Sequence, residues 1–341
     1  MTELNDWQQQ NTTDNTEAKN DIVEPYIHNY SQPHQLKIQK TTKSLMGFPA
    51  QLALLLGLTG VALILASIVS LVILRIMTGS PLLEMQKALE NPANAAAVQV
   101  VQVVSTALVF LIPAVIFSAI VHGSVTKHLQ FKSFASYQQI VLVFLLAFAG
   151  VFVSGALAEV NSVIPIPKNW EIYFRQLEDA YNKQVLVMAK MSNWKDLLIA
   201  LFVIALTPAI FEEVLFRGVI QQFFTGWFKN GWIAIAVTSI LFSAIHMSYF
   251  GFLPRMGLGI ILGLLFYFSR NIWTSILLHF LNNGFAVAQL YVLNMQGKLT
   301  KDALEDKFPI WIGFAAIVCL VSLLYLFKKD AEKNTFTPTN A

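Results

Sequence analysis

The sequence predicts an all-α fold: a polytopic membrane helical bundle of about eight transmembrane helices, with an interfacial amphipathic helix before the fourth. Hydrophobic residues make up 55% of the 341 residues, and charged residues only 13%. A soluble domain has about 25% charged residues. The charged residues are also unevenly spread and leave long uncharged runs. These runs approach the ~20 apolar residues that a helix needs to cross a bilayer.

Composition also limits the classes of function. The formal net charge of +3 is too small to indicate a nucleic-acid-binding surface, so we expect no nucleic-acid partner. The single cysteine, Cys319, cannot form a disulfide within the chain. No phosphate-binding P-loop and no GxSxG motif is present, which argues against a nucleotide-driven pump and a serine hydrolase.

Three regions follow one another along the chain. Residues 1–44 are polar, rich in Asn, Gln, Thr and Asp, and are expected to form a disordered tail. Residues 45–327 are expected to form the integral membrane domain, with a motif-bearing core at 195–295. Residues 328–341 are expected to form a short basic and polar C-terminal tail.

Eight runs are candidates for membrane spans by their length and lack of charge. They are Leu45–Leu74, Ala95–Val121, Gln138–Ala158, Leu197–Phe224, Gly231–Ser248, Met256–Ser269, Asn271–Leu293 and Phe308–Phe327. Pro113 is expected to kink the second run. Gly259 and Gly263 in the sixth run have GxxxG spacing, which favours close approach of a neighbouring helix.

The longest loop between the runs, 159–194, combines two patterns. Its prolines in "NSVIPIP" favour an extended turn. Apolar and aromatic residues then recur at helical spacing, which predicts an amphipathic helix at the membrane interface. These residues are Trp170, Tyr173, Phe174, Leu177, Tyr181, Val185 and Met188. The helix is either a substrate rim or a plain connector, and the connector is the simpler interpretation.

The orientation in the membrane is inferred from lysines near the ends of the membrane domain. An even number of spans places both termini on one side, and the positive-inside rule then favours cytoplasmic termini. The lysines concerned are Lys37, Lys40, Lys43, Lys328, Lys329 and Lys333. The 159–194 loop on the opposite side is also basic, which weakens the argument. We expect an integral, multi-pass protein of a bacterial inner (plasma) membrane.

Ionisable and amide side chains occur within the late runs, where they are costly. Glu213 and Arg217 are separated by four residues, so they share a helix face and can form an ion pair. Glu212 points about 100° away and needs a partner from another helix. His279 and Asn283 also share one face, and His246 lies near the end of the fifth run.

The simplest interpretation of a single polar residue in a span is an interhelical hydrogen bond. The clustering of six such residues in three late runs indicates instead a functional site where the fourth, fifth and seventh runs meet. Arg255 and Arg270 lie at the ends of runs, where snorkelling explains them.

Two hydrolytic chemistries fit this set of residues. Glu212, His246 and His279 could ligate a divalent metal such as zinc. Without a metal, Glu212 could take a proton from water oriented by His246, while His279 and Asn283 donate hydrogen bonds to an oxyanion. We favour the second scheme and expect no cofactor, with zinc as the alternative.

Three segments resemble motifs of a known family. "EEVLFR" at 212–217 resembles EExxxR, "FSAIH" at 242–246 resembles FxxxH, and "HFLNN" at 279–283 resembles HxxxN. In this order they are similar to the CPBP family of intramembrane proteases, which includes type II CAAX prenyl endopeptidases and bacteriocin-processing Abi-like proteins.

The resemblance implies a site open to the cytosol and assigns a role to each motif residue. Glu212 is then the general base, His246 holds the water, and His279 and Asn283 form the oxyanion site. Glu213 and Arg217 support them, with Glu213 reaching His279, and Phe242 packs. The expected depths are a difficulty, because straight spans would place Glu212 and His246 at different levels unless a helix breaks, for example near Pro208.

The expected function is hydrolysis of a peptide bond in a membrane-associated protein or peptide. The expected partners are this substrate and the lipid bilayer, and the sequence leaves the oligomeric state open. The alternative is a non-catalytic membrane immunity or scaffold protein of the same family. A proton-coupled transporter is a third hypothesis, but the first half of the chain repeats none of the motifs.

Overall fold

The computed structural model describes residues 44–134, 136–299 and 310–335, and these contain helices and no strand. The expected tail at 1–44 and the lysines at 37, 40 and 43 therefore lie, except for Ser44, outside the described residues. The helices before the long loop are α1 (Phe48–Thr78), η1 (Leu82–Glu84), α2 (Met85–Glu90), η2 (Pro92–Asn94), α3 (Ala95–Thr106), η3 (Ala107–Leu111), α4 (Ile112–His122), α5 (Val125–His128) and α6 (Tyr137–Ser162). The later helices are α7 (Lys168–Met188), α8 (Trp194–Ala200), η4 (Leu201–Leu206), α9 (Thr207–Leu215), η5 (Phe216–Gln221), α10 (Gln222–Phe228), α11 (Gly231–Ala244), α12 (Phe252–Ser269), α13 (Ile272–Met295) and α14 (Ile310–Thr335).

Seven helical stretches in the described part of the chain are long and apolar enough to cross a membrane. The fold is therefore the predicted polytopic all-α bundle. The fifth predicted run differs, because its helix α11 has only 14 residues and ends at Ala244. At about 1.5 Å per residue α11 is roughly 21 Å long, which is shorter than the ~30 Å hydrocarbon core.

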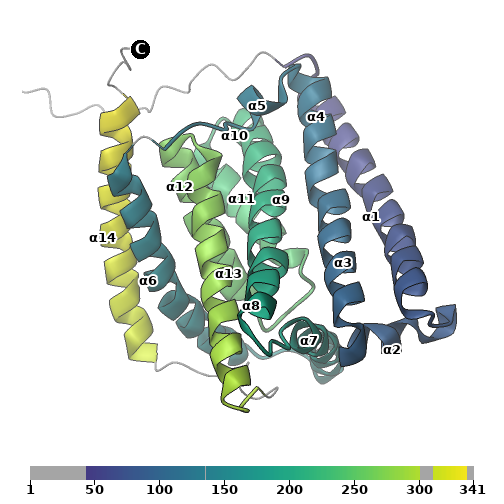
Figure 1. The fold of residues 1–341 in the computed structure, drawn as a ribbon. Helices are drawn as coiled ribbons and strands as arrows, with labels where there is room; N and C mark the ends of the chain where they lie inside the picture. The colour runs from purple at the N-terminus through teal and green to yellow at the C-terminus, as the bar shows by residue number, and fades with distance from the viewer. Residues whose placement is uncertain (1–43, 135, 300–309, 336–341) are drawn as a thin grey trace, which may run out of the picture. The chain divides into compact units, whose positions relative to one another are not determined.

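The helices of the membrane domain stand side by side (Figure 1). α1 packs against α3 and α4 at one edge, and α6 packs against α14 at the other. α9, α11, α12 and α13 lie between these edges. Large apolar side chains on the outer helices are more than half exposed, including Leu56 and Ile64 of α1 and Trp311 and Val318 of α14. Such surfaces suit lipid rather than water.

The two largest of the buried apolar clusters join most of the membrane helices. One joins α6, α12, α13 and α14 through residues such as Leu146, Leu262 and Phe327. The other joins α1, α4, α9 and the start of α13, through residues such as Leu55, Phe117 and Val214. The C-terminal helix α14 continues eight residues beyond the predicted end of the last run, and Asp330 accepts a hydrogen bond from Ser136 before α6.

Proline explains two local widenings of the membrane helices. The π-helical turns η3 and η4 end directly before the helical segments that contain Pro113 and Pro208 at their second positions. Proline donates no hydrogen bond and crowds the carbonyl four residues earlier, so the preceding turn widens. The helix from Trp194 to Phe228 is nevertheless continuous, so the expected break near Pro208 is a widened turn.

The glycine pair of α12 makes the predicted close approach. A Cβ at Gly259 would lie 3.1 Å from the backbone Cα of Ser239 on α11, and one at Gly263 would lie 3.0 Å from Ile235 of the same helix. α11 and α12 therefore pack with almost no space between their backbones. This leaves the carbonyl groups of both glycines accessible to neighbouring side chains.

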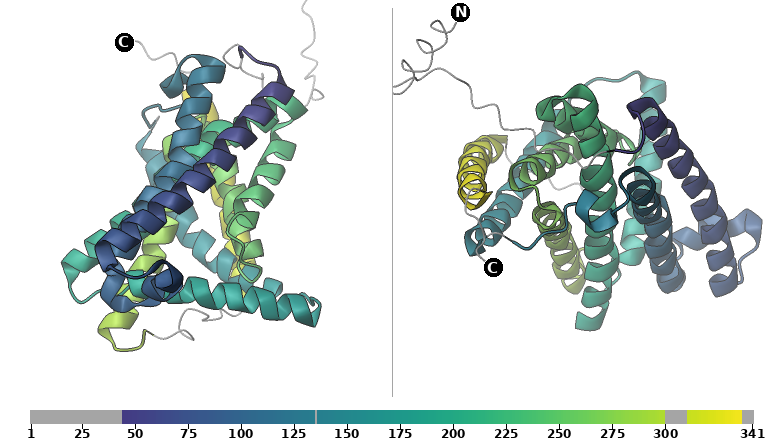
Figure 2. Two further views of the ribbon diagram at one scale, coloured as in Figure 1. Left: turned by 90° about the vertical axis from the view of Figure 1, so that its right-hand side faces the viewer. Right: turned by 90° about the horizontal axis from the view of Figure 1, so that it is seen from above.

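The predicted amphipathic helix is α7, and it lies across one end of the bundle (Figure 2, left). Trp170, Tyr173 and Tyr181 on it are about half exposed. The described start of α1 and the end of α14 lie at the opposite end of the bundle (Figure 1). α7 therefore lies at the membrane face away from these two helix ends.

Candidate active site

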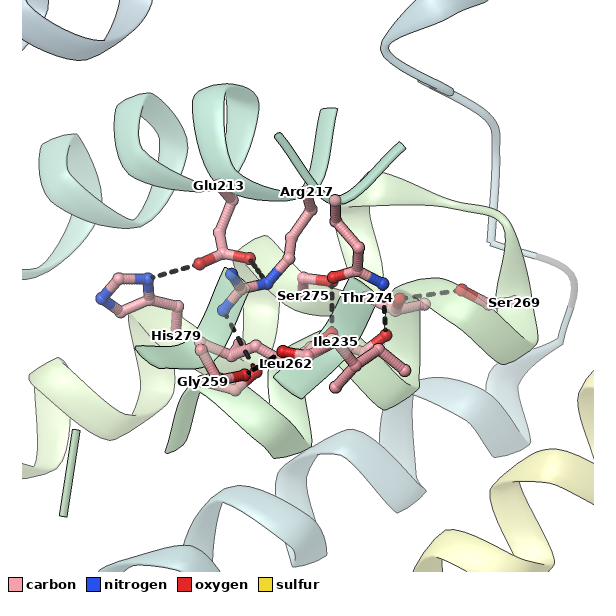
Figure 3. Close-up of polar contacts among 12 residues, drawn as sticks. Glu213, Arg217, Ile235, Gly259, Leu262, Ser269, Thr274, Ser275 and His279 are labelled. Carbon is pink, nitrogen blue, oxygen red and sulfur yellow. Dashed lines mark hydrogen bonds and ion pairs between the residues drawn. The ribbon is translucent and has the colours of Figure 1, made fainter. Parts of the chain in front are cut away.

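Glu213 is the centre of a buried charged group (Figure 3). Its Oε2 lies 3.1 Å from Nε of Arg217, and its Oε1 lies 3.1 Å from Nδ1 of His279 on α13. Glu213 and Arg217 have no exposed surface, and His279 has only 3%. The expected ion pair on one helix face is present, and so is the contact between Glu213 and His279 that the family resemblance implied.

Arg217 extends this group to α12. Its Nη2 donates to the carbonyl of Gly259 at 3.3 Å, and one turn later Gln221 donates to the carbonyl of Gly263 at 3.0 Å. The two glycines at GxxxG spacing therefore supply both close helix packing and two buried acceptors. The Nη1 atom of Arg217 is buried and makes no hydrogen bond to a described residue.

The ring of Phe242 on α11 fills the centre of the site. It meets the ring of His246 edge to face at 5.2 Å and that of His279 at 5.8 Å, between ring centroids. The guanidinium carbon of Arg217 lies 5.3 Å from the centroid of the same ring. Phe242 is 2% exposed, in agreement with the expected packing role.

Glu212 lies beside this group but outside the ion pair. Its carboxylate is buried, and Oε2 makes no hydrogen bond to a described residue. Its ionisable neighbours are His279, Glu213, Arg217 and Arg255. The ionisable neighbours of His246 are Arg255 and His279. Glu212 and His246 therefore have two neighbours in common.

The helix lengths remove the expected difference in depth between these two residues. Glu212 lies 16 residues before Phe228, the end of α10, and His246 lies 15 residues after Gly231, the start of α11. Because α10 and α11 are adjacent and joined by a short turn, both residues lie about 22–24 Å from that turn. The apparent mismatch arose because the fifth run was counted as a full span.

His246 lies in the loop 245–251, which helices α6 and α7 help to hold in place. Nδ2 of Asn161 on α6 donates to the carbonyl of Tyr249 at 2.8 Å, and its Oδ1 accepts from the backbone N–H of Leu253 at 3.0 Å. On α7, Glu178 accepts from the Ser248 hydroxyl at 2.6 Å. The amphipathic helix therefore helps to position the loop of a candidate catalytic residue.

A hydrogen bond to the backbone defines the protonation of neutral His246. Its Nδ1 lies 2.8 Å from the carbonyl oxygen of Phe242. A carbonyl only accepts, so Nδ1 carries the proton and Nε2 of the neutral ring is an acceptor. An acceptor at Nε2 can orient a water molecule by accepting one of its hydrogens.

Asn283 contacts the carbonyl that the proline turn releases. Its Nδ2 lies 3.4 Å from the carbonyl oxygen of Ile204, four residues before Pro208, and its Oδ1 lies 3.4 Å from Nδ2 of Asn282. Both hydrogen bonds are long. The second N–H of the Asn283 amide is available to another acceptor, because a primary amide has two donors.

Arg255 is the neighbour that the sequence did not identify. It lies in the first turn of α12 and is partly buried, rather than extended into the interface as expected. Its proximity to Glu212 depends on the folding back of the loop 245–251, which no sequence pattern reports.

The alternative zinc ligands can be compared with the geometry. Within the described ranges, no three His, Cys, Asp or Glu side chains lie close enough together to hold one metal ion. Glu212, His246 and His279 form no such group there, and the zinc alternative stays a prediction.

Comparison with known proteins identifies the central segment. Residues 194–285 match a family model described as "Type II CAAX prenyl endopeptidase Rce1-like". No curated protein and no solved structure matches the chain. The matched segment extends from the first residue of α8 through all three motifs and ends two residues after Asn283. Residues 194–285 are therefore an Rce1-like domain of the type II CAAX prenyl endopeptidase family, in agreement with the CPBP resemblance, within an integral multi-pass membrane protein.

Proposed function

We propose that this protein is an intramembrane endopeptidase that uses Glu212 to activate water against a peptide bond in a membrane-associated protein or peptide. The observation that carries the proposal is the arrangement around Glu212. This carboxylate is buried, has an oxygen without a hydrogen bond, and adjoins the Glu213–His279 pair in the matched domain. A general base needs a free acceptor oxygen near the reacting atoms.

Each remaining residue supplies one part of the reaction. Glu212 takes a proton from the attacking water. Nε2 of His246 accepts a hydrogen bond from the other O–H of this water and so orients the lone pair of its oxygen. The tetrahedral oxyanion receives hydrogen bonds from Asn283 and His279. Nε2 of His279 donates when the ring carries both protons, and the contact of Nδ1 with the carboxylate of Glu213 holds the ring in place.

The leaving amine needs a proton, and the protonated Glu212 is its source. This returns Glu212 to the carboxylate and completes the cycle. Arg217 anchors Glu213 and so fixes the ring of His279, without contact with the substrate. The motif residues act in this scheme without a cofactor.

The test uses purified protein in lipid nanodiscs and a comparison of membrane proteomes. Glu212→Gln keeps the shape of the side chain and removes its basicity, so cleavage should fall by at least ~100-fold, in line with the contribution of a general base. His246→Ala should have a similar effect. Both variants should retain the unfolding transition of the parent protein.

The alternatives make different predictions for the same variants. A non-catalytic immunity or scaffold protein would retain its biological activity with Glu212→Gln, and this result would refute the protease. Zinc analysis of the purified protein, with cleavage assayed before and after chelation, tests the metal alternative. Substrate-dependent proton flux in vesicles would instead support the transporter hypothesis.

A further inference from the structure

A pocket lies where the loop before α6 meets the turn between α12 and α13. Its volume is about 520 Å³. The residues that line it are Phe131, Lys132, Ser133, Phe134 and Trp273. Ser136 in the same loop donates a hydrogen bond to Asp330, so the pocket lies at the face of the bundle where the described part of α14 ends (Figure 1). None of the motif residues lines it, and the proposed chemistry makes no use of it.

Hydrogen bonds between the two segments give the pocket a fixed wall. The backbone N–H of Ile272, the first residue of α13, donates to the carbonyl of Gln130 at 3.2 Å. The amide of Asn271, which is 3% exposed, donates to the carbonyl of Ser133 at 3.0 Å. These last two residues are 138 positions apart in the sequence. The pocket is therefore a feature of the tertiary fold rather than of one loop alone.

Two cations lie close together at this pocket. Lys132 is part of its wall, and Arg270 directly precedes Asn271. The surrounding chain desolvates the ammonium of Lys132 and so lowers its pKa, with a smaller effect from the charge of Arg270. The guanidinium carbon of Arg270 lies 5.1 Å from the ring centroid of Tyr267. A lysine and an arginine from different segments thus approach each other closely enough to interact.

The neighbouring carboxylates do not neutralise these two cations. The ionisable group that acts on Lys132 is Arg270, and the one that acts on Arg270 is Tyr267. Asp330 accepts a hydrogen bond from Ser136 in the same loop. Among the described residues, no ion pair joins a carboxylate to Lys132 or Arg270. Because two adjacent cations repel each other, this place favours a ligand with negative charge.

The surroundings of the pocket are those of a lipid headgroup. The ring of Trp273 is 38% exposed and meets the ring of Phe131 edge to face, at 5.5 Å between centroids. Tryptophan is enriched at the level of lipid headgroups. From the same loop, α6 enters the membrane with Tyr137, Ile140 and Phe144 exposed along one helix face. A lipid at the pocket would find cations for its headgroup and an apolar helix face for its acyl chains.

We propose that Lys132 and Arg270 bind the phosphate of an anionic phospholipid from the surrounding bilayer. Arginine can bind two phosphate oxygens at once, lysine supplies a compact charge, and the hydroxyl of Ser133 in the wall is a further donor. A soluble phosphate has the same chemistry, but the aromatic wall and the exposed face of α6 favour the lipid. The site does not depend on the proposed endopeptidase activity.

The experiment counts the lipids bound to the full-length protein by native mass spectrometry. The protein in dodecyl maltoside is titrated with dioleoyl phosphatidylglycerol, which is anionic, or with dioleoyl phosphatidylcholine, in which the choline cancels the phosphate charge. We expect the first phosphatidylglycerol to bind roughly 10-fold or more tightly than phosphatidylcholine, in line with one charge-assisted hydrogen bond. Glycerol phosphate, which lacks acyl chains, should not displace it at equal concentration.

Three variants and one matched control locate the site. Lys132→Gln and Arg270→Asn should each abolish most of the preference for phosphatidylglycerol, whereas Lys132→Arg should retain it. Asparagine is chosen because Arg270 has a φ of 52°, which asparagine tolerates. The control is Lys229→Gln, which removes an exposed lysine with a φ of 53° from the turn between α10 and α11. It lowers the net charge by the same amount and should leave the preference unchanged.

Each outcome supports or overturns the lipid site. Equal affinity for the two lipids, a preference that survives Lys132→Gln, or an equal loss with Lys229→Gln would overturn the proposal. Displacement by glycerol phosphate at equal concentration would identify a soluble phosphate as the ligand and overturn the lipid. The unfolding transition of every variant is measured in parallel. If Arg270→Asn does not fold, the comparison of Lys132→Gln with Lys132→Arg decides, because this side chain is exposed.

Discussion

The buried pair of Glu213 and Arg217 allows a quantitative test of how charge is accommodated in this bundle. Arg217→Met removes the guanidinium and leaves the Glu213 carboxylate, with no exposed surface, facing an apolar side chain. It also removes the hydrogen bond to the carbonyl of Gly259. Breaking a buried pair from one side costs about 3–5 kcal/mol. His279 on the other oxygen of Glu213 compensates part of this loss, so we expect about 3 kcal/mol.

The double variant isolates the interaction itself. Glu213→Gln alone leaves an unpaired guanidinium and should cost a similar amount. When Glu213→Gln and Arg217→Met are combined, neither charge remains buried. The loss should then be at least ~2 kcal/mol smaller than the sum of the two single losses.

The assay is reversible unfolding in mixed micelles, with increasing dodecyl sulfate in dodecyl maltoside and helix content followed by circular dichroism. The exposed pair Glu171 and Arg175 on α7 is the control, because it has the same four-residue spacing and a 2.9 Å contact. Its coupling should be at most ~0.5 kcal/mol. If the losses at Glu213 and Arg217 simply add, the pair is not the source of stability and this reasoning is wrong.

Three further predictions concern other parts of the chain. Gly259→Ala places a methyl group 3.1 Å from the backbone of α11, so the free energy of unfolding should fall by about 1–3 kcal/mol. The control Gly60→Ala, with nothing within 4 Å, should change it by less than ~1 kcal/mol. Equal effects of the two variants would contradict the close packing. Asn161→Ala releases the loop of His246 and should lower kcat for peptide cleavage by about tenfold, and an unchanged kcat would show that the loop is held by other contacts. Burial lowers the pKa of His128 from 6.5 to about 3, with a smaller effect from His122. As pH decreases, the unfolded chain therefore binds a proton at His128 before the folded chain does, and the free energy of unfolding should fall between pH 6.5 and about 3. His128→Gln should reduce this pH dependence.

The polar face of the fourth span could be predicted from sequence because it depends on local spacing. Glu213 and Arg217 are four residues apart on one helix, so their contact follows from helical geometry alone. The family motifs likewise indicated which helices meet, and the contact of His279 with Glu213 agrees with them. The roles of these residues in catalysis stay predictions.

Contacts between segments that are far apart in the sequence could not be predicted from local spacing. The depth of His246 depends on where α11 ends, and its run of apolar residues continues past that point to Ser248. Arg255 has the sequence context of an interfacial arginine at a helix end, but the folded loop brings it towards Glu212. The part of Asn161 in holding this loop has no local signal, because its partners lie 88 and 92 positions away.

Two expectations concern the orientation in the membrane: cytoplasmic termini and a site open to the cytosol. The structure makes each depend on the other. His246 lies in a loop held by α7, at the membrane face away from the described start of α1 and the end of α14 (Figure 1). Cytoplasmic termini would therefore place the loop of His246 nearer the outer face, and a site open to the cytosol would require termini on the outside. Basic residues occur on both faces of the described structure: those of α5 and of the end of α14 lie on the side of the helix ends, and those of α2 and α7 lie on the α7 side. Impermeant labelling of a cysteine introduced at Lys229, on the side of the described helix ends, measures the orientation. Labelling from outside would place the loop of His246 on the cytosolic side, and protection from the label would place this loop on the outer side.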